Sequence, residues 1–387
     1  MVAAASASPI AARAPSAGAI LLGDAIVDAV PYRSRRRRDR LCIALLAPFS
    51  GPAGLWGPSC QTSAVLAARE INEGGGVLGR ELELAFIDAG RDPETVTYET
   101  LDLIVEGGAE AVIGMHISAV RQALVRALKG RVPYVYTPVY EGGEKAPGVF
   151  MMGETPSLQV KPAIAWLTTR HGARRWYLMG NDYVWPRVSH RAARRYVAAN
   201  GGEVVGESYV PFGCEDYEAC LDHIARTRPD AVLVSMVGSD CVTFNRAFAD
   251  AGLDRHILRL SAASEENTLL GIGAENAGNL FFAAGYLAGL ETDANLAFLD
   301  RYHGAFGKEA PVPNTIGESC YEGVRFYAEL ARRAEALDVE TLGRASQDLC
   351  YVGARGRSRM LARHLQTDIY LAQADGLDFR VVQHFPV

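Results

Sequence analysis

Short apolar runs that alternate with helical segments constrain the fold of this chain more than any other feature. Residues 111–113 predict a buried strand, residues 119–129 an amphipathic helix, and residues 132–136 a second buried strand. Continuous apolar strands separated by helices indicate a parallel sheet that is covered on both faces. In such sheets ligands bind beyond the carboxyl ends of the strands. The sequence therefore predicts a binding site just after residues 113 and 136.

The two predicted strand ends carry hydroxyl groups, aromatic rings and one carboxylate. Ser118 follows the first strand, and Thr137, Tyr140 and Glu141 follow the second. Ser118 sits where a helix starts, so a purely structural capping role competes with ligand binding. We favour ligand contact, because a capping serine and free N–H groups at a helix start also bind carboxylates and amide oxygens.

The same strand–helix alternation continues along the chain. Strands are expected over residues 41–47, 81–88, 148–152, 175–180, 203–209, 231–235, 257–260 and 279–284, with a sheet-like alternation over 372–387. Helices are expected over residues 59–73, 92–106, 157–168, 188–200, 217–226, 242–251, 293–306 and 318–336. Asp92 and Asp293 are predicted N-caps, and the glycines at 74–76 are predicted to end a helix rather than to cradle a phosphate.

Two sets of alternating strands and helices predict two domains. The fold class is α/β, with two doubly wound, Rossmann-like parallel-sheet domains that are joined by a multi-strand hinge and close like a clamshell. The chain is expected to cross between them near residues 150–160, 285 and 340. The expected division is a flexible extension over 1–38, a first ligand-binding domain over 39–157 plus 286–338, and a second over 158–285 plus 339–387.

Composition limits the classes of function. A length of 387 residues suits about two domains, and a net charge of −6 argues against a general nucleic-acid binder. No run reaches the roughly 18 apolar residues of a membrane span. The seven cysteines have no paired spacing, which argues against a zinc site and fits a reducing compartment; a Cys214–Cys220 disulfide is compatible with the spacing but not required.

The N-terminal region bears on location. Asp24 and Asp28 interrupt its one apolar patch, so a secretory signal peptide is not predicted. The arginines at 35–38 precede an apolar run and superficially suggest a twin-arginine export signal. Cleavage there would remove the first strand of the fold, so a solvated charge run is the simpler interpretation, and a cytoplasmic location is favoured.

Several segments resemble a known family. Residues 45–52 (LLAPFSGP) and 67–80 (AAREINEGGGVLGR) resemble the opening of type I periplasmic-binding-fold proteins of the branched-chain amino-acid type. Residues 140–142, 180–187 and 358–376 are similar to the branch that binds short amides and urea, which includes the amide sensor of aliphatic amidase expression and urea-transporter binding proteins. The resemblance covers about residues 40–387.

This resemblance implies a small ligand held between the two domains. The positions that match the family's contacts are Ser118, Tyr136, Thr137, Tyr140, Tyr183, Trp185, His116 and Glu265. Trp185 is larger than the tyrosine or phenylalanine of other members, and His116 stands where the amide sensor has an aromatic residue. The implied function is binding of an amide, urea or amino-acid-like solute, without a cofactor or a metal.

The resemblance leaves the partner open. Occupancy would be passed either to an ABC permease, for which a periplasmic location is implied, or to a cytoplasmic regulatory protein; a homodimer is compatible with both. The alternative from another class is an amidohydrolase, in which Glu141 and Asp182 would act as acid and base. Residue patterns give this enzyme little support, because the chain lacks a nucleophile motif such as GxSxG.

Overall fold

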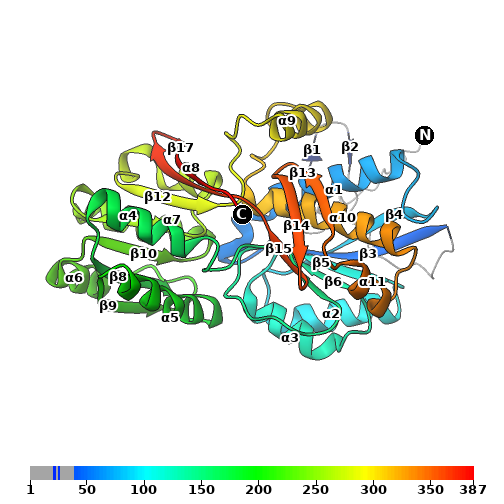
Figure 1. The fold of residues 1–387 in the computed structure, drawn as a ribbon, viewed down its shortest axis with the longest axis horizontal. Coiled ribbons are helices and arrows are strands. Elements are labelled where there is room, and N and C mark those ends of the chain that lie inside the picture. The colour runs from blue at the N-terminus through cyan, green and yellow to red at the C-terminus, as the bar shows by residue number, and fades with distance from the viewer. Residues whose placement is uncertain (1–20, 23–24, 27–38) are drawn as a thin grey trace, which may run out of the picture. The chain divides into compact units, whose positions relative to one another are not determined.

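The structure is a computed structural model that describes residues 21–22, 25–26 and 39–387. Residues 1–31 form a separate unit, in which β1 (Leu21–Leu22) pairs antiparallel with β2 (Ala25–Ile26). The rest of the expected flexible extension, including the arginine run at 35–38, lies outside the described residues. Residues 39–387 contain two sheets, each of which forms the centre of one α/β lobe (Figure 1).

The first lobe contains an eight-stranded sheet with the order β13-β14-β15-β7-β6-β5-β3-β4. All pairs from β15 to β4 are parallel, and β13, β14 and β15 pair antiparallel at one edge. The central strands are apolar throughout because both faces are covered. The strands are β3 (Arg40–Ala47), β4 (Glu81–Asp88), β5 (Ala111–Gly114), β6 (Tyr134–Tyr136), β7 (Val149–Met151), β13 (Cys350–Gly353), β14 (Gly356–Leu361) and β15 (His364–Gln366).

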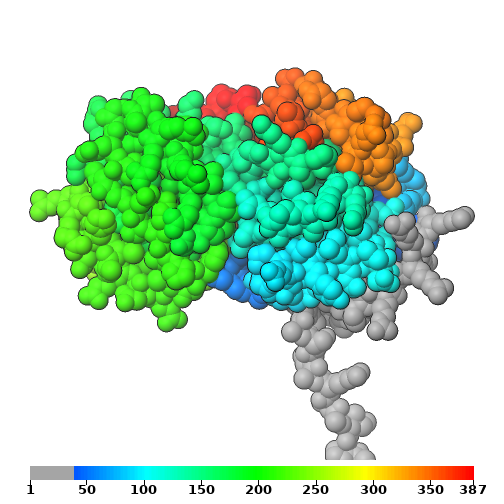
Figure 2. All heavy atoms as spheres, turned by 90° about the horizontal axis from the view of Figure 1, so that it is seen from below, coloured from blue at the N-terminus to red at the C-terminus, as the bar shows by residue number. Residues whose placement is uncertain are grey.

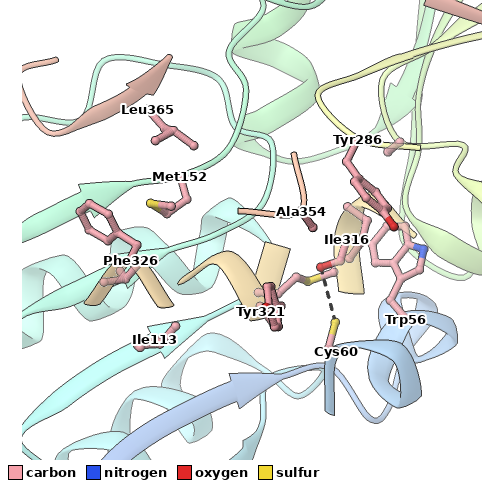
Figure 3. Close-up of a cluster of buried hydrophobic side chains, with 14 of the residues drawn as sticks. Trp56, Cys60, Ile113, Met152, Tyr286, Ile316, Tyr321, Phe326, Ala354 and Leu365 are labelled. Atoms are coloured by element: carbon pink, nitrogen blue, oxygen red, sulfur yellow. Dashed lines mark hydrogen bonds between the residues drawn. The ribbon is translucent and has the colours of Figure 1, made fainter. Parts of the chain in front are cut away.

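Helices cover both faces of this sheet. On one face lie α1 (Gly57–Glu73) and α10 (Thr315–Ala334), which bury the side chains shown in Figure 3; on the other lie α2 (Pro93–Val105) and α3 (Ser118–Leu128). The 3-10 helix η1 (Pro52–Trp56) precedes α1, while α9 (Asp293–Phe306) packs on α1 and α11 (Val339–Ala345) packs on α10. Asp92 caps α2 as predicted, accepting hydrogen bonds from two backbone N–H groups.

The second lobe contains a seven-stranded sheet with the order β17-β16-β12-β11-β10-β8-β9. Its strands are parallel except at the C-terminal edge, where β16 and β17 pair antiparallel. The strands are β8 (Arg175–Asn181), β9 (Glu203–Val210), β10 (Ala231–Ser235), β11 (Leu258–Ser261), β12 (Leu280–Ala284), β16 (Ile369–Asp375) and β17 (Asp378–Phe385).

The helices of this lobe again cover both faces. Side chains of α4 (Val160–His171) and α5 (Val184–Ala199) pack on one face, and those of α6 (Glu218–Thr227) and α7 (Gly238–Asp250) pack on the other. The short helices are α8 (Glu266–Ile272), η2 (Leu253–Arg255) and η3 (Ala274–Asn276). The predicted fold class, two α/β lobes with mostly parallel sheets, is confirmed.

The chain passes between the two sheets three times. It crosses between β7 and α4, between β12 and α9, and between β15 and β16. The first two crossings lie near the predicted positions. The third lies between residues 366 and 369, because residues 350–366 pair in the first sheet, whereas the division at residue 339 placed them in the second. A short alternating strand looks the same at either sheet edge, so its sequence does not show which sheet it joins.

Several helices begin earlier than predicted. α5 begins at Val184 rather than near residue 188, so Trp185 and Arg187 lie in its first turn. Pro186 fits there because the N–H it lacks has no partner at a helix start. α9 is capped by Thr292, not by Asp293, which is the first helical residue. These shifts move side chains predicted to lie in loops onto helix N-termini.

The cysteines and the helices provide two further observations. All seven cysteines are free thiols, and Cys214 donates to the backbone oxygen of Asp216 rather than pairing with Cys220. None of the helices in the described part of the chain is long and apolar enough to cross a bilayer.

Candidate ligand-binding site

The first turn of α3 faces the space between the two lobes. Its N-cap residue, Ile117, is extended and offers no side chain that can cap the helix. The first backbone N–H groups of α3 therefore have no side-chain acceptor. Because they lie at the positive end of the helix dipole, these groups are suited to bind a carbonyl oxygen or an anion.

Two helices of the second lobe repeat this arrangement. Tyr183 precedes α5 and Val237 precedes α7, and neither helix has a side-chain cap. Ile117, Tyr183 and Val237 all line the same cavity. Residues at the N-terminal ends of three helices from the two lobes therefore line one space, and N–H groups at helix starts are suited to bind a ligand's oxygen.

The cavity is walled mainly by apolar side chains. Its free volume is about 30 Å³, so the side chains of the two lobes nearly fill it in this structure. α3 and α5 contact each other beside it, and Figure 2 shows the green second lobe against the cyan part of the first. The lining residues are Ala53, Trp56, Met115, His116, Ile117, Ser118, Tyr136, Pro138, Val139 and Ile316 from the first lobe, and Tyr183, Trp185, Val237 and Ala263 from the second.

Ser118 connects the cavity to a buried cluster of charges. Its hydroxyl donates to Glu141 Oε2 at 2.6 Å, and Arg121 Nη2 donates to Glu141 Oε1 at 2.6 Å. Arg121 also pairs with Glu144. The side chains of Arg121 and Glu141 are each 4% exposed. Because one arginine faces two carboxylates here, this cluster carries a net negative charge beside the cavity.

Tyr136 and His116 present polar atoms that are already engaged. The Tyr136 hydroxyl donates to the backbone oxygen of His116 at 2.7 Å. The His116 ring lies 3.0 Å from the Tyr134 hydroxyl through Nε2 and 3.2 Å from the backbone oxygen of Ile117 through Nδ1. Burial lowers the pKa of His116 to about 3, so the ring is neutral at ordinary pH. His116 is therefore a hydrogen-bonded wall residue.

Tyr183 and Trp185 supply the aromatic wall of the second lobe. Their ring centroids are 6.2 Å apart, and Tyr183 also packs 5.0 Å from Phe212. Burial raises the pKa of Tyr183, so its hydroxyl stays protonated. Two aromatic rings beside a helix N-terminus can cover the flat face of a ligand while the N–H groups bind its oxygen.

Two other residues implied by the resemblance lie behind the cavity rather than in its wall. Thr137 is buried against α10, where it accepts a hydrogen bond from Ser319 at 3.0 Å. The Tyr140 hydroxyl lies 2.7 Å from His364 Nδ1, and Tyr140 lines a neighbouring polar cleft. Both follow β6 as predicted, but their side chains point toward helix α10 and strand β15 of the first lobe.

Glu265 serves as the N-cap of α8. Its carboxylate accepts the backbone N–H groups of Asn267 and Thr268, at 2.7 and 3.0 Å, and it does not line the cavity. Oε1 also accepts the indole N–H of Trp56 from the other lobe at 2.7 Å. Burial raises the pKa of Glu265, and the hydrogen bonds from Thr268, Asn267 and Trp56 oppose this shift. The structure thus places Glu265 in a contact between the lobes.

Trp56 is a cavity residue that the sequence analysis missed. It ends η1 and is 4% exposed, and Figure 3 shows it beside Ile316 and Tyr286. The available signal was a tryptophan directly after the glycine- and proline-rich loop that follows β3. Such a loop lies at a strand end, where an aromatic residue is well placed to contact a ligand.

Glu141 and Asp182, the hypothetical acid and base, belong to separate ion pairs. Glu141 is held by Ser118 and Arg121, whereas Asp182 is exposed and pairs with Arg187 at 2.6 Å. The hydrogen bond from Arg187 lowers the pKa of Asp182. Among the described residues, no group of three His, Cys, Asp or Glu side chains is arranged to hold a metal ion.

Sequence comparisons identify relatives of this chain. A stretch of 76 residues is 33% identical to the leucine-, isoleucine-, valine-, threonine- and alanine-binding protein of Pseudomonas aeruginosa, covering 20% of each chain. A stretch of 201 residues is 24% identical to the Leu/Ile/Val-binding protein BraC3 of Rhizobium johnstonii, covering 50% of this chain and 53% of the relative. The matches thus span about half or less of these curated relatives.

Solved structures share the fold over nearly the whole chain. A solute-binding protein of an ABC transporter from Rhodopseudomonas palustris, in complex with p-hydroxybenzoic acid, matches with a TM-score of 0.82 at 20% identity over 90% of this chain and 97% of that chain. The substrate-binding protein LivJ of Streptococcus pneumoniae, in complex with isoleucine, matches with a TM-score of 0.79 at 21% identity over 90% and 99%.

A family model agrees with this fold. The model described as periplasmic binding protein matches residues 41–378, which include every residue of the cavity and both sheets apart from the first residue of β3 and most of β17. With two α/β lobes of the type I arrangement and a cavity at their facing helix N-termini, this chain belongs to the periplasmic binding protein family.

Proposed function

We propose that this chain is a non-enzymatic solute-binding protein of the ABC-transporter type. Its ligand is a small molecule with an amide, urea or amino-acid-like group. The observation that carries this proposal is the meeting of three uncapped helix N-termini at one cavity lined by both lobes. Helix N-termini bind carbonyl and carboxylate oxygens without further charge.

The ligands of related structures support this class. The Rhodopseudomonas protein was crystallised with p-hydroxybenzoic acid and the Streptococcus protein with isoleucine, and both of these ligands carry a carboxylate. An amide or urea presents a carbonyl oxygen of similar shape. The apolar wall then contacts the remainder of the ligand, with Trp56, Tyr183 and Trp185 as its aromatic part.

The two lobes act as the two ligand-binding domains, and their contact across the cavity reports occupancy. Ser118, Tyr136, Tyr183 and Trp185 touch the ligand, whereas Thr137, Tyr140 and Glu265 support the wall from behind. Both solved relatives named above belong to transport systems, so we assign the permease of an ABC transporter as the partner. If the protein acts as a sensor instead, its partner would be a regulatory protein.

Calorimetric titration tests this proposal. We expect saturable binding of at least one probe among acetamide, urea, benzamide and isoleucine, with one ligand per chain. We also expect no ammonia to be released from the amides during prolonged incubation. Absence of binding by every probe would overturn the proposed ligand class. Ammonia release that is lost in Glu141→Gln would replace the binding protein with an amidohydrolase.

A further inference from the structure

We infer that Glu141 makes this cavity select ligands that present an N–H donor, although Glu141 is not part of the cavity wall. It does so through Ser118, which lines the cavity and whose hydroxyl donates to Glu141. Glu141 is therefore a positioning residue, and the inference names the ligand chemistry of the site. It rests on the proposed function, because it concerns the solute held in this cavity.

The hydrogen-bonding capacity of Ser118 carries the argument. A serine hydroxyl has one hydrogen and two lone pairs. The hydrogen lies on the 2.6 Å contact to Glu141 Oε2, because a carboxylate can only accept. Ser118 Oγ thus keeps only lone pairs for a ligand. A ligand N–H satisfies them, whereas a carboxylate oxygen at the same place meets a second acceptor.

Arg121 keeps Glu141 in the acceptor state. Its guanidinium donates to Glu141 Oε1 at 2.6 Å, and both side chains are 4% exposed. Hydrogen bonds to ionised partners are stronger than neutral ones, so reversing the Ser118 hydrogen bond would give up a charge-assisted contact. Arg121 also pairs with Glu144, so this one arginine faces two carboxylates. The net negative charge also disfavours an acidic group at the Ser118 end of the cavity.

Tyr136 has the same polarity toward the cavity. Its hydroxyl hydrogen is donated to the backbone oxygen of His116 at 2.7 Å, so the oxygen keeps only lone pairs for other partners. The side-chain oxygens of Ser118 and Tyr136 are thus both acceptors, while the donors are the N–H groups of α3, α5 and α7. A ligand that matches this wall has an oxygen acceptor and an N–H donor, as primary amides, ureas and amino acids do.

The experiment compares isosteric probes. Calorimetry would measure the affinities of benzamide against benzoate and of acetamide against acetate for wild-type protein and Glu141→Gln. We expect the wild type to prefer each amide by about tenfold or more, the typical effect of one satisfied rather than one opposed hydrogen bond. In Glu141→Gln the glutamine amide can donate to Ser118 Oγ, which leaves the Ser118 hydroxyl hydrogen free for the ligand. The ratio of amide to carboxylate affinity should therefore fall toward unity or reverse.

Two further variants keep the test decisive. Glu144→Gln removes a charge from the same arginine without touching Ser118, and it should retain most of the amide preference. Ser118→Ala should lose the amide preference because it binds the amides more weakly. The double variant Ser118→Ala with Glu141→Gln should show nearly the same ratio of amide to carboxylate affinity as Ser118→Ala alone. If Glu141→Gln does not fold, as thermal unfolding would show, Ser118→Ala alone decides whether Ser118 acts as an acceptor.

The outcomes separate this inference from the proposed function. An amide preference that disappears in Glu141→Gln and Ser118→Ala supports both. Binding with a wild-type preference for the carboxylates, or an amide preference that Glu141→Gln leaves unchanged, overturns the inference and leaves a solute-binding protein. The inference is also overturned if Ser118→Ala weakens the binding of the carboxylates alone. If the wild type binds none of these four probes and neither urea nor isoleucine, the proposed ligand class is removed and this inference with it.

Discussion

Two buried clusters of charge, each centred on one arginine, perform different tasks in this protein. Arg121 pairs with Glu141 and Glu144 beside the cavity. Arg355 pairs with Glu154 at 2.9 Å and with Glu318 at 2.7 Å, and all three of these side chains are at most 5% exposed. The residue types are nearly the same, so the difference lies in what surrounds them.

The Arg355 cluster holds the backbone where the chain crosses between the lobes. Glu154 accepts the backbone N–H of Gly285 at 2.8 Å, which joins the first and second crossings. Arg355 donates to the backbone oxygen of Thr315 at 3.0 Å. Its hydrogen bonds thus end on the protein itself. The Arg121 cluster instead ends on Ser118, which lines the cavity, so under the proposed function it would act on the ligand.

Breaking the crossing cluster should have the largest effect. Arg355→Ala leaves Glu154 and Glu318 buried without their cation, and such a loss typically costs about 3–5 kcal/mol of the free energy of unfolding. Urea unfolding would measure it. Arg359→Ala, which breaks an exposed pair with Asp348, is the matched control and should cost about 0–1 kcal/mol. Equal stability of the two variants would contradict a structural role for Arg355.

Glu266 is a buried carboxyl group without a cationic partner among the described residues, and it can be compared with the carboxylates of the two arginine clusters. Glu266 is buried and accepts the backbone N–H of Ala288, which lies in the second crossing. Burial and then the charge of Glu265 raise the pKa of Glu266 to about 8. An unfolded glutamate titrates near pH ~4.3, so the unfolded chain loses this proton first as the pH rises. The contribution of Glu266 to stability should therefore fall between about pH 4 and pH 8, by at most about 5 kcal/mol.

Glu266→Gln would isolate this pH dependence. The variant should lose the part of the decline in the free energy of unfolding that Glu266 causes, and it should be more stable than the wild type at pH 9. Urea unfolding at pH 5, 7 and 9 would measure the change. Glu291→Gln alters an exposed glutamate nearby and should follow the wild-type profile. Parallel profiles for Glu266→Gln and the wild type would show that Glu266 is ionised in the folded protein.

Substitutions in the cavity wall should change the affinity for a ligand more than substitutions at the crossings do. Trp185→Ala removes an aromatic wall, and losing burial of a large side chain is worth roughly 1.5–3 kcal/mol, or about ten- to a hundredfold in affinity. Calorimetry with a bound probe would measure this loss. Because Trp185 also belongs to the buried core, unfolding without ligand should be recorded alongside. Trp166→Ala, which lies on α4 away from the cavity, should leave affinity unchanged.

The contact between the lobes should show the smallest effect. Trp56→Phe keeps an aromatic ring but removes the N–H that donates to Glu265, and one such bond contributes about 1 kcal/mol. Glu265 retains its cap bonds to α8, so folding of the second lobe should be preserved. Ligand titration should show affinity reduced about fivefold. An unchanged affinity would indicate that the Trp56–Glu265 bond does not stabilise the bound arrangement.

The sequence by itself determined the elements of the fold. The apolar run at 111–113 is β5, the alternating run at 81–88 is β4, and the cap at Asp92 begins α2, each as predicted. These features are local, because strand periodicity and helix capping depend on residues only a few positions apart. The sequence also placed Ser118, Tyr183 and Trp185 at strand ends, and all three line the cavity.

Only the tertiary structure decided which polar atoms remain free for a ligand. Ser118 and Glu141 are 23 residues apart, and Trp56 and Glu265 are 209 residues apart, so no local pattern shows these bonds. Two other contacts also join residues that are far apart in the sequence and could not be predicted from local patterns. Residues 350–366 complete the first sheet, and Thr137 bonds to α10. A side chain's chemistry is fixed by its type, but its free donors and acceptors depend on the partners that folding brings to it.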